Sequence, residues 1–423
     1  MCAVMADQAN HRFLIGTNSF KRENEIHLIN YSEDSNRIDQ EAVFQVESGE
    51  VWSISSSPYN KNIFACGQQC QLNGEHSLAL YDISEAKEST REFDKKNLKI
   101  KTLLKGNKES SHTSNIHSIC WEDAEYQEGY AAKEIVSADT SRVIVWDIKQ
   151  STQKLSYDPQ SFLNDEDSLG ECSVVKRDPH HKEILCLGIE KGFYQIDQRI
   201  PIKNAASDIA ISQNRAHSDL IMDLDYNPNK LNTVATCGQD SVIRFWDLRK
   251  TEKSLLEYEE DSHWIGKIKY NKFHDQLLLT GCTSTFVSLY SAPSVSQMPQ
   301  SQINDLNTTL MTSMTLPDGG YGYGPDTERM LTQTQRNDTE SQMDIISSRY
   351  YQSNQLGQTF RQQNQPINRN GVRLLQRYEL EDSVHVIDWS AGDAWIFAGV
   401  SYNGTFFLNL VPSKEKYKIL LIE

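Results

Sequence analysis

The sequence predicts an all-β fold in which seven small sheets are arranged around an axis as a β-propeller. Three observations predict it: a motif that recurs at a nearly constant spacing, short segments in which apolar and polar residues alternate, and an almost complete lack of helical periodicity. The chain has 423 residues and a formal net charge of −16. We expect a single repeat-built domain over residues 11–423 to account for that length.

The repeat is clearest in two segments. HTSNIHSICW begins at His112 and leads to a strand-like segment that ends at Trp146 and Asp147, and HSDLIMDLDY begins at His217 and leads to one that ends at Trp246 and Asp247. In both segments an aromatic residue follows nine positions after the His, and a turn containing Asp precedes the last strand. The Trp-Asp ending is typical of WD repeats, whose four-stranded blades close into a ring.

Five weaker copies of this strand ending bring the predicted number of blades to seven. They are Ile29-Asn30, Tyr81-Asp82, Ile196-Asp197, Tyr290-Ser291 and Leu408-Asn409. The steps between the second residues of successive endings are 52, 65, 50, 50, 44 and 118. Two long steps require insertions, which we place at residues 84–111, a charged segment between strands, and at residues 294–370.

The second insertion is the long loop that we expect between the sixth and seventh blades. Residues 294–370 are rich in Gln, Asn and Ser and contain YGYGPD and QTFRQQNQP, which cannot form a core strand. We interpret the segment as a mostly disordered loop. Two alternatives stay open for its role: a neutral insertion, or a segment that binds a partner or regulates the protein.

The two ends of the chain bear on how the ring closes. We expect four strands in the seventh blade, at about residues 384–390, 395–401, 404–410 and 416–422, so that the final KYKILLIE is a strand. The first blade has candidate strands at residues 11–17, 25–31 and 40–46 but no clear innermost strand. The short CAVMA segment at residues 2–6 is a candidate stub of that strand, so either this blade has three strands or the N-terminus pairs in a way that the sequence does not reveal.

Polar residues inside the repeat predict a buried hydrogen-bond network. A Trp at the end of the third strand fills the space between neighbouring blades, and its indole N–H then needs an acceptor. In one blade the set is His217, Thr236, Asp240 and Trp246; in another, His112, Ser137 and Trp146 are present, but Asp139 stands one position early and Thr140 takes the turn position. The set looks like a catalytic His-Asp-Ser arrangement, but its recurrence with the repeat favours a structural role.

The remaining composition excludes several classes of protein. The acidic balance argues against a general nucleic-acid surface. No apolar run reaches about 18 residues, and the N-terminus has no apolar core of a secretory signal. Most of the eight Cys stand in apolar segments, and Cys66 and Cys70 have no second pair at zinc spacing. We therefore expect no enzyme, no catalytic residue, no cofactor, no metal site and no membrane insertion.

With these segments identified, the chain resembles the EARP-interacting protein family of WD-repeat proteins. The matching stretches cover roughly half of the chain: RFLIGTNSFKRENEIHLINY (12–31), SGEVWSISSSP (48–58), DLDYNPNK with FWDLR (223–230 and 245–249), HWIGKIKYNKFHDQLLLTG (263–281), SVHVIDWSAGDAWIFAGVSYNG (383–404) and KYKILL (416–421). The sequence departs from the family in lacking an extra N-terminal strand, in a Gln/Asn-rich instead of acidic insertion, and in having Asp261 and Leu380 where His is expected.

The resemblance implies a protein-interaction scaffold. It would be an adaptor of the EARP and GARP tethering complexes, in endosomal recycling and in retrograde transport from endosomes to the Golgi. Its partners would be tethering subunits, and it would lie in the cytoplasm, as a monomer within a larger complex, associated peripherally with endosomes and the trans-Golgi network. A structural component of another assembly, such as a cilium, is a further alternative.

Candidate partner-binding residues follow the His position of each repeat, where the chain emerges on one face. They are Glu50, Trp52, Asn115, His117, Asp219, Ile221, Trp264, Asp382 and His385. Trp264 is the candidate of most interest, because exposed aromatic residues often dominate binding energy, although it can equally pack against the next blade. Arg199 and Arg249 end IDQR and WDLR on the opposite face, a pairing that resembles the docking element of substrate receptors for cullin-type ubiquitin ligases.

Overall fold

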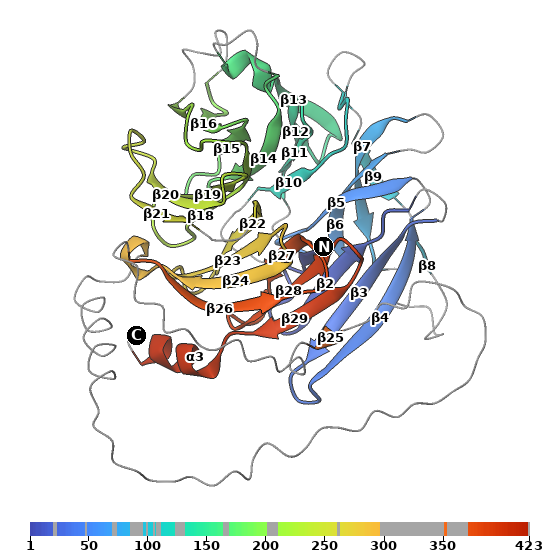
Figure 1. Cartoon of the computed structure of the whole chain (residues 1–423). Helices are drawn as coiled ribbons and strands as arrows, with labels where there is room; N and C mark the ends of the chain where they lie inside the picture. The colour runs from blue at the N-terminus through green and yellow to red at the C-terminus, as the bar shows by residue number, and fades with distance from the viewer. Residues whose placement is uncertain are drawn as a thin grey trace, which may run out of the picture.

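A computed structural model describes most of the predicted domain. The described residues are 1–19, 23–46, 49–69, 74–84, 96–98, 100–104, 106, 111–122, 132–163, 169–200, 210–259, 263–296, 351–352 and 371–421. Their strands form seven sheets arranged as a ring (Figure 1), which confirms the seven-bladed β-propeller. Each innermost strand contacts the innermost strands of the two neighbouring sheets, and these contacts run without a break around the ring.

Each blade is a short sheet, read here from the axis outward. The first holds β1 (Cys2–Ala3), β2 (His11–Gly16), β3 (Glu25–Ser32), β4 (Arg37–Val46) and, parallel to β4, β8 (Lys96–Leu98). The second holds β5 (Glu50–Ser56), β6 (Ile63–Gln69), β7 (His76–Asp82) and β9 (Ile100–Leu104). The third holds β10 (Ser118–Trp121), β11 (Glu134–Ala138), β12 (Val143–Asp147) and β13 (Thr152–Tyr157), and the fourth β14 (Cys172–Arg177), β15 (Ile184–Ile189), β16 (Gly192–Asp197) and β17 (Ile211–Gln213).

The last three blades follow the same order. The fifth holds β18 (Ile221–Tyr226), β19 (Thr233–Gly238), β20 (Val242–Asp247) and β21 (Leu256–Glu259). The sixth holds β22 (Ile265–Tyr270), β23 (Leu277–Cys282), β24 (Phe286–Ser291) and β26 (Arg373–Glu379). The seventh holds β27 (Val384–Trp389), β28 (Ile396–Ser401), β29 (Phe406–Leu410) and β25 (Tyr351–Gln352). Two 3₁₀ turns, Pro159–Phe162 and Pro293–Val295, lie in connections.

The strand directions define two faces of the ring. Innermost strands from β5 to β27 begin on one face, here called the upper face, and third strands such as β16 and β20 end on the other, the lower face, because neighbouring strands are antiparallel. All seven predicted strand endings, from Ile29-Asn30 to Leu408-Asn409, fall within the third strands. The sequence therefore places the blades correctly even where Trp and Asp are replaced.

The hydrophobic core lies between blades. Second strands such as β19 and β23 are buried along their whole length, whereas the outer strand β13 alternates between exposed and buried residues. Phe193 of the fourth blade packs edge-on against Trp246 of the fifth, with ring centroids 5.4 Å apart. This contact is the blade-to-blade role predicted for the Trp of the repeat.

A glycine near the end of the second strand allows blades to approach one another closely. A Cβ on Gly281 of the sixth blade would lie 2.7 Å from Val384 Cγ1 of the seventh, and one on Gly67 of the second blade would lie 2.8 Å from Ile116 Cβ, next to the third. Real Cβ atoms do not tolerate such distances without a shift of the neighbour. We did not predict this role from the sequence.

The first blade has an innermost strand, β1, which pairs with β2. β1 pairs with β2 in antiparallel register, with Cys2 opposite Leu14, so the CAVMA segment supplies the innermost strand. The Ala3 N–H donates a 2.9 Å hydrogen bond to Asp388 Oδ2 of the seventh blade. Ala3 and Phe13 also share a hydrophobic cluster with Ile396 and Phe406, which joins the first blade to the last.

The strand predicted at residues 416–422 is wrong, because the chain forms the helix α3 (Ser413–Leu420) there. KYKILL alternates lysine and apolar residues as a strand would, but Pro412 ends the preceding extended segment, and Glu415 in the first turn and Lys418 in the last match the helix dipole. Ile419 packs into the cluster that contains Trp395. Among the residues that the structure describes, the outer side of β29 pairs with β25, in a parallel register of two residues.

The two expected insertions differ in what the structure describes. Residues 84–111 include β8 and β9, so this segment supplies the outer strand of the second blade. Residues 294–370 stand between β24 and β26 in the chain, ahead of the last blade. Of this segment, the structure describes residues 294–296, at the turn Pro293–Val295, and the strand β25. The disorder expected for the rest lies outside the described residues.

Candidate functional site

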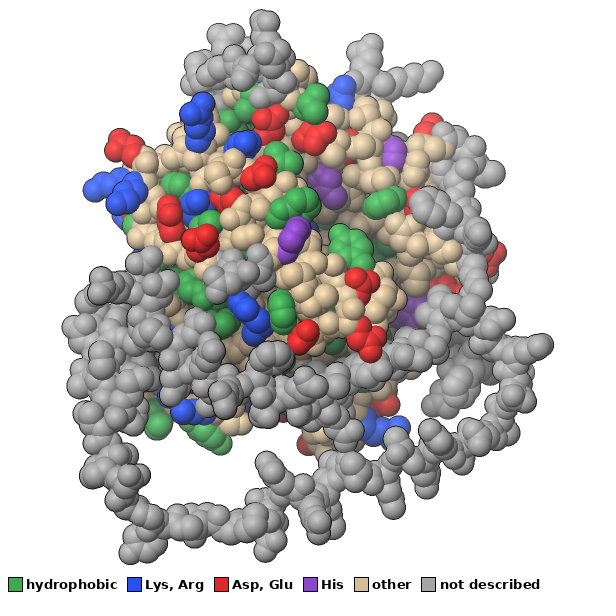
Figure 2. All heavy atoms as spheres, viewed as in Figure 1, with side chains coloured by type: hydrophobic (Ala, Val, Ile, Leu, Met, Phe, Trp, Pro, Cys, Tyr) green, Lys and Arg blue, Asp and Glu red, His purple; other side chains and the backbone are tan. Residues whose placement is uncertain are grey.

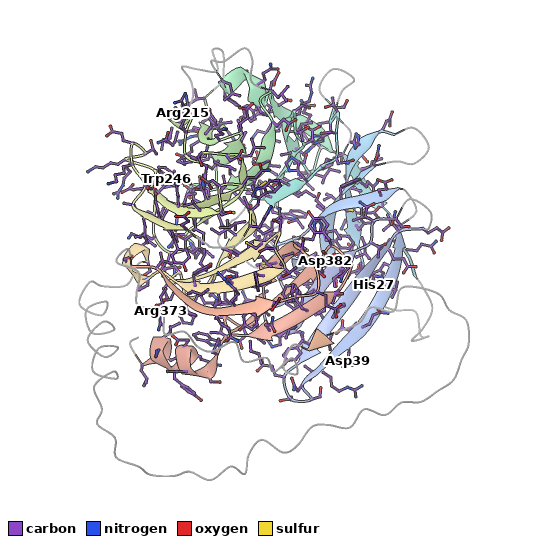
Figure 3. The ribbon with its side chains drawn as sticks, in the orientation of Figure 1. His27, Asp39, Arg215, Trp246, Arg373 and Asp382 are labelled. Atoms are coloured by element: carbon purple, nitrogen blue, oxygen red, sulfur yellow. The ribbon has the colours of Figure 1, made fainter. Side chains whose placement is uncertain are left out.

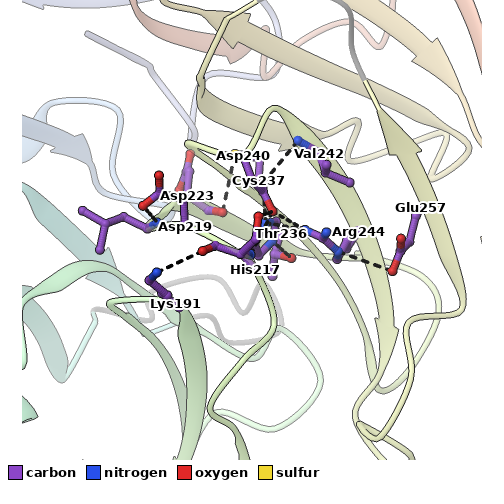
Figure 4. A network of polar contacts seen from close by, with 12 residues as sticks. Lys191, His217, Asp219, Asp223, Thr236, Cys237, Asp240, Val242, Arg244 and Glu257 are labelled. Atoms are coloured by element: carbon purple, nitrogen blue, oxygen red, sulfur yellow. Dashed lines mark hydrogen bonds and ion pairs between the residues drawn. The ribbon is translucent and has the colours of Figure 1, made fainter. Parts of the chain in front are cut away.

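The structure brings together the four residues of the network predicted in the fifth blade, and Figure 4 shows His217, Thr236 and Asp240 among them. The Trp246 indole N–H donates to Thr236 Oγ1 over 2.9 Å, and His217 Nε2 lies 2.7 Å from the same hydroxyl oxygen. His217 Nδ1 lies 2.9 Å from Asp240 Oδ1. The network therefore connects the loop before β18 with the second and third strands of the blade.

Sequence reasoning missed Arg244, which completes this network. Its guanidinium donates to Asp240 Oδ2 over 2.6 Å, and its side chain also approaches Glu257 Oε1, at 3.4 Å (Figure 4). Burial acts to raise the pKa of Asp240, but the bonds from His217 and Arg244 outweigh it and hold that pKa well below its usual range. Burial lowers the pKa of His217, against the opposing effect of Asp240. The sequence feature that could have revealed Arg244 is its position four residues after Asp240.

The third blade keeps the same network in a modified form. His112 Nε2 lies 2.7 Å from Ser137 Oγ, which accepts a 2.7 Å hydrogen bond from the Trp146 indole N–H. Asp139 Oδ2 lies 3.3 Å from His112 Nδ1 and accepts a bond of 2.7 Å from the backbone N–H of Thr113. Although Asp139 stands one position early in the sequence, its carboxylate therefore still lies next to the imidazole of His112.

The burial of these hydroxyl groups decides what the networks can do chemically. Thr236 and Ser137 are completely buried, and each hydroxyl is already bonded to both a histidine and an indole. A nucleophile needs access to its substrate, and these two oxygens have none. The arrangement instead holds the Trp side chain between blades, which is a structural function.

The first three upper-face candidates lie at the starts of innermost strands, with different exposure. Trp52 is 38% exposed, and its indole N–H donates to Glu50 Oε2 over 3.2 Å. Glu50 itself is buried, so its carboxylate supports Trp52 and is not presented to solvent, contrary to the prediction of an exposed binding residue. Asn115, just before β10, is half-buried.

The two candidates of the fifth blade, Asp219 and Ile221, differ in their exposure to solvent. Asp219 is exposed, and its Oδ1 accepts the N–H of Leu220 over 2.9 Å. Ile221 is the first residue of β18 and is buried in the core, which removes it from any binding surface. His117 in the third blade is half-buried, and burial lowers its pKa to about 4, helped by Lys267.

The remaining upper-face candidates cluster on the sixth and seventh blades. Trp264 is 41% exposed, and its ring lies 4.9 Å from that of His263. His385 is paired in the same way with Tyr402, at 4.8 Å, and Tyr402 is 65% exposed. Asp382 lies near the middle of the ring in this view (Figure 3). Tyr402 was missed because it follows a second strand, outside the positions next to the His of the repeat.

Arg199 and Arg249 follow β16 and β20 on the lower face, as predicted from the direction of these strands. Both side chains are 69% exposed. Each is bonded to the Asp two residues earlier: Arg199 Nε to Asp197 Oδ1 over 2.9 Å, and Arg249 Nε to Asp247 Oδ1 over 2.9 Å. A partner carboxylate would have to compete with these internal carboxylates for the two guanidinium groups.

A set of charged residues on the innermost strands was also missed. Lys176 Nζ lies 3.8 Å from Asp225 Oδ1, and Lys269 Nζ lies 3.9 Å from Asp388 Oδ1, so the pairs join the fourth blade to the fifth and the sixth to the seventh. Burial lowers the pKa of Lys176, whereas Asp388 and Asp225 outweigh the burial of Lys269 and raise its pKa. The sequence signal for these charged residues is the pair of like charges two residues apart in DLD (223–225) and in KIK (267–269).

Two searches of the described residues bear on ligands and membranes. Within the described ranges, no group of three or more His, Cys, Asp or Glu is arranged to hold a metal ion. No helix in the same part of the chain has the length and apolar character needed to cross a bilayer.

The known proteins that this chain resembles carry closely related names. The chain is 27% identical to a protein of Macaca fascicularis named EARP and GARP complex-interacting protein 1, over 97% of this chain and 93% of the relative. It is 29% identical to the EARP-interacting protein homolog of Danio rerio, over 100% and 96%, and 25% identical to EARP-interacting protein 1 of Caenorhabditis elegans, over 99% and 95%. The family model described as the EIPR1 beta-propeller matches residues 1–290, more than half of the 423 residues, and this protein therefore belongs to the EIPR1 β-propeller family.

Proposed function

We propose that this protein is a non-catalytic adaptor of EARP and GARP tethering complexes, acting in endosomal recycling and in retrograde transport from endosomes to the Golgi. It would act in the cytoplasm, as a monomer within the larger complex, attached to endosomes and the trans-Golgi network through its protein partners. The observation that carries the proposal is similarity along nearly the whole chain to relatives named for their interaction with these complexes.

The architecture supports an adaptor. A closed ring presents rigid upper and lower faces on which separate proteins can bind. The His-Asp-hydroxyl arrangements that look catalytic, at His217 and at His112, are buried inside the fifth and third blades. The upper face, in contrast, exposes large aromatic side chains, and such residues commonly supply most of the binding energy of a protein interface.

Affinity purification of the full chain from its native organism tests the proposal directly. We expect subunits of a tethering complex to be recovered with it. Recovery of a cullin adaptor without tethering subunits would overturn the proposal and favour a ubiquitin-ligase substrate receptor that uses Arg199 and Arg249.

Trp264→Ala tests whether the upper face is the binding surface. Removing a half-exposed indole from the centre of an interface should reduce recovery of tethering subunits about tenfold. Because 41% of Trp264 is already exposed, the melting temperature should change by no more than about 2 °C. Phe273→Ala serves as the matched control, because Phe273 is 51% exposed and follows the end of β22, on the lower face. A large fall in melting temperature would show that Trp264 is mainly a core residue and contradict its assignment to the interface.

A further inference from the structure

The exposed aromatic residues of the sixth and seventh blades belong to one connected surface. The Trp264 carbonyl accepts a 3.0 Å bond from the N–H of Thr283, whose carbonyl accepts a 2.6 Å bond from Ser383 Oγ. The Ser383 carbonyl in turn accepts a 2.9 Å bond from the N–H of Tyr402. Trp264 and Tyr402 are thus held by the same backbone connection across the boundary between two blades.

Histidine rings support both aromatic side chains from one side. His263 lies 4.9 Å from Trp264 and is itself fixed by a 2.9 Å contact between its Nδ1 and Thr283 Oγ1. His385 lies 4.8 Å from Tyr402, and burial lowers the pKa of His385 to about 4, so this ring is neutral at neutral pH. Beside these histidine rings, Trp264 and Tyr402 remain 41% and 65% exposed.

Four acidic residues stand in the chain segments that lead to Trp264 and to Ser383. β21 ends at Glu259 just before Trp264, and β26 ends at Glu379 just before the loop that carries Glu381 and Asp382. Glu259, Glu379 and Glu381 are exposed, and Asp382 is half-buried. Among the described residues, none of these four carboxylates takes part in an ion pair. Figure 2 shows acidic, hydrophobic and histidine side chains together around the middle of the viewed face.

We propose that this acidic-aromatic surface, defined by Trp264, Tyr402, Glu259, Glu379, Glu381 and Asp382, binds a segment of the partner that is rich in lysine or arginine. The inference rests on the proposed function, because it names the chemistry of the partner that the adaptor recognises. A cation can lie over the open face of an indole or phenol and pair with a neighbouring carboxylate at the same time. An acidic or phosphorylated segment would instead meet unpaired carboxylates on a chain whose net charge is −16.

A binding assay with the purified full chain tests the chemistry without knowledge of the partner. The probe is a fluorescent synthetic peptide of alternating lysine and leucine, compared with one of alternating glutamate and leucine, and the readout is fluorescence anisotropy. We expect the lysine peptide alone to bind. The double variant Glu381→Lys/Asp382→Lys should weaken binding at least about tenfold, and Tyr402→Ala about fivefold.

The control separates a local surface from the general acidity of the protein. Asp34→Lys/Asp39→Lys makes the same change in net charge, at exposed positions of the first blade, and Asp39 lies far from Asp382 in Figure 3. This variant should change the dissociation constant less than about twofold. Equal weakening by both double variants, or equal binding of the glutamate peptide, would overturn the inference. Melting temperatures within about 2 °C of the wild type confirm that all variants are folded.

Affinity purification with the same variants distinguishes failure of the inference from failure of the proposed function. Loss of tethering subunits with Glu381→Lys/Asp382→Lys, but not with Asp34→Lys/Asp39→Lys, supports the inference. Undiminished recovery with both variants overturns the inference and leaves the proposed function standing. If the wild-type chain recovers no tethering subunit, the proposed function fails, and the peptide assay alone decides what the surface binds.

Discussion

At the scale of single residues, the repeat uses polar side chains to place a large apolar one. The Trp246 indole fills the space beside Phe193, but its N–H would be buried without a partner if Thr236 were not there. Thr236 in turn is oriented by His217, whose second ring nitrogen is held at Asp240. Each residue of the set is thus required by the one before it, which explains why four residue types recur at fixed spacing.

Thr236→Val tests this dependence, because valine has nearly the same shape as threonine but no hydroxyl. The substitution leaves the Trp246 N–H and the His217 Nε2 without their common partner, and the free energy of unfolding should fall by about 1–3 kcal/mol. Urea unfolding measures the change. Thr233→Val, in the same strand, is the control, since the Thr233 hydroxyl has one bond of 3.3 Å to a backbone carbonyl. An equal loss in the two variants would show that the network adds nothing special.

Histidine burial predicts how stability depends on pH. Burial lowers the pKa of both His117 and His385 to about 4, below the value of 6.5 expected in the unfolded chain. Between these values the unfolded state binds more protons, so the free energy of unfolding should decrease as the pH falls from about 6.5 to about 4. The lowered pKa of Asp240 acts at more acidic pH, where the stability contributed by its carboxylate is lost on protonation.

Urea unfolding between about pH 7 and about pH 4.5 measures this loss. His117→Asn removes one titrating group, and the fall in stability over this range should be smaller than in the wild type, by on the order of 1 kcal/mol. Parallel curves for the two proteins would mean that His117 titrates normally in the folded state.

At the scale of strands and helices, the sequence predicted those elements whose pattern repeats. The third strands were found even where Tyr290-Ser291 replaces Trp-Asp, because alternation and spacing were kept. The C-terminal segment was misjudged because KYKILL, in which Lys416 and Lys418 alternate with Tyr417 and Ile419, fits a strand as well as one face of α3. Contacts with Trp395, made by Ile419 and Lys416, decide between the two forms, and they depend on residues distant in the sequence.

The candidate site was predicted less completely, for a related reason. Trp264 and Asp382 follow from the position of each repeat on the upper face, but Tyr402 joins them through hydrogen bonds between blades that no local pattern reports. Glu50 was assigned to the surface by the same positional rule, and the neighbouring Trp52 covers it. Position in the repeat predicts the face of the ring, whereas exposure depends on neighbouring side chains.

The close approach of the sixth and seventh blades predicts the effect of a substitution at the boundary between them. Gly281→Ala would place a methyl group 2.7 Å from Val384 Cγ1, and the shift needed to relieve it should lower the free energy of unfolding by about 1–3 kcal/mol. In Gly266→Ala, on the adjacent strand, the new Cβ would lie 3.7 Å from the nearest atom, the carbonyl oxygen of Gly281. Thermal unfolding should show a lower melting temperature for Gly281→Ala only, and similar melting of both variants would contradict a tight boundary at β23 and β27.

At the scale of the whole molecule, the ring is held together by contacts between the innermost strands of neighbouring blades. Innermost strands contact one another around the full circle, and the charged pairs of Lys176 and Lys269 cross two of the boundaries. The helix α3 follows β29 of the seventh blade and is not part of these contacts between innermost strands.

Cysteines that are buried, or half-buried in the case of Cys120, give the ring an internal set of chemical reporters. Cys2, Cys66, Cys120, Cys172, Cys186, Cys237 and Cys282 are free thiols that lie in the first six blades, with at least one in each. Burial raises the pKa of Cys66, Cys172 and Cys186 to about 12, which leaves almost no reactive thiolate at neutral pH. An alkylating reagent reaches such a thiol only after its own blade opens. The order in which these cysteines become labelled therefore records which blades separate first, in the natural sequence and without an added probe.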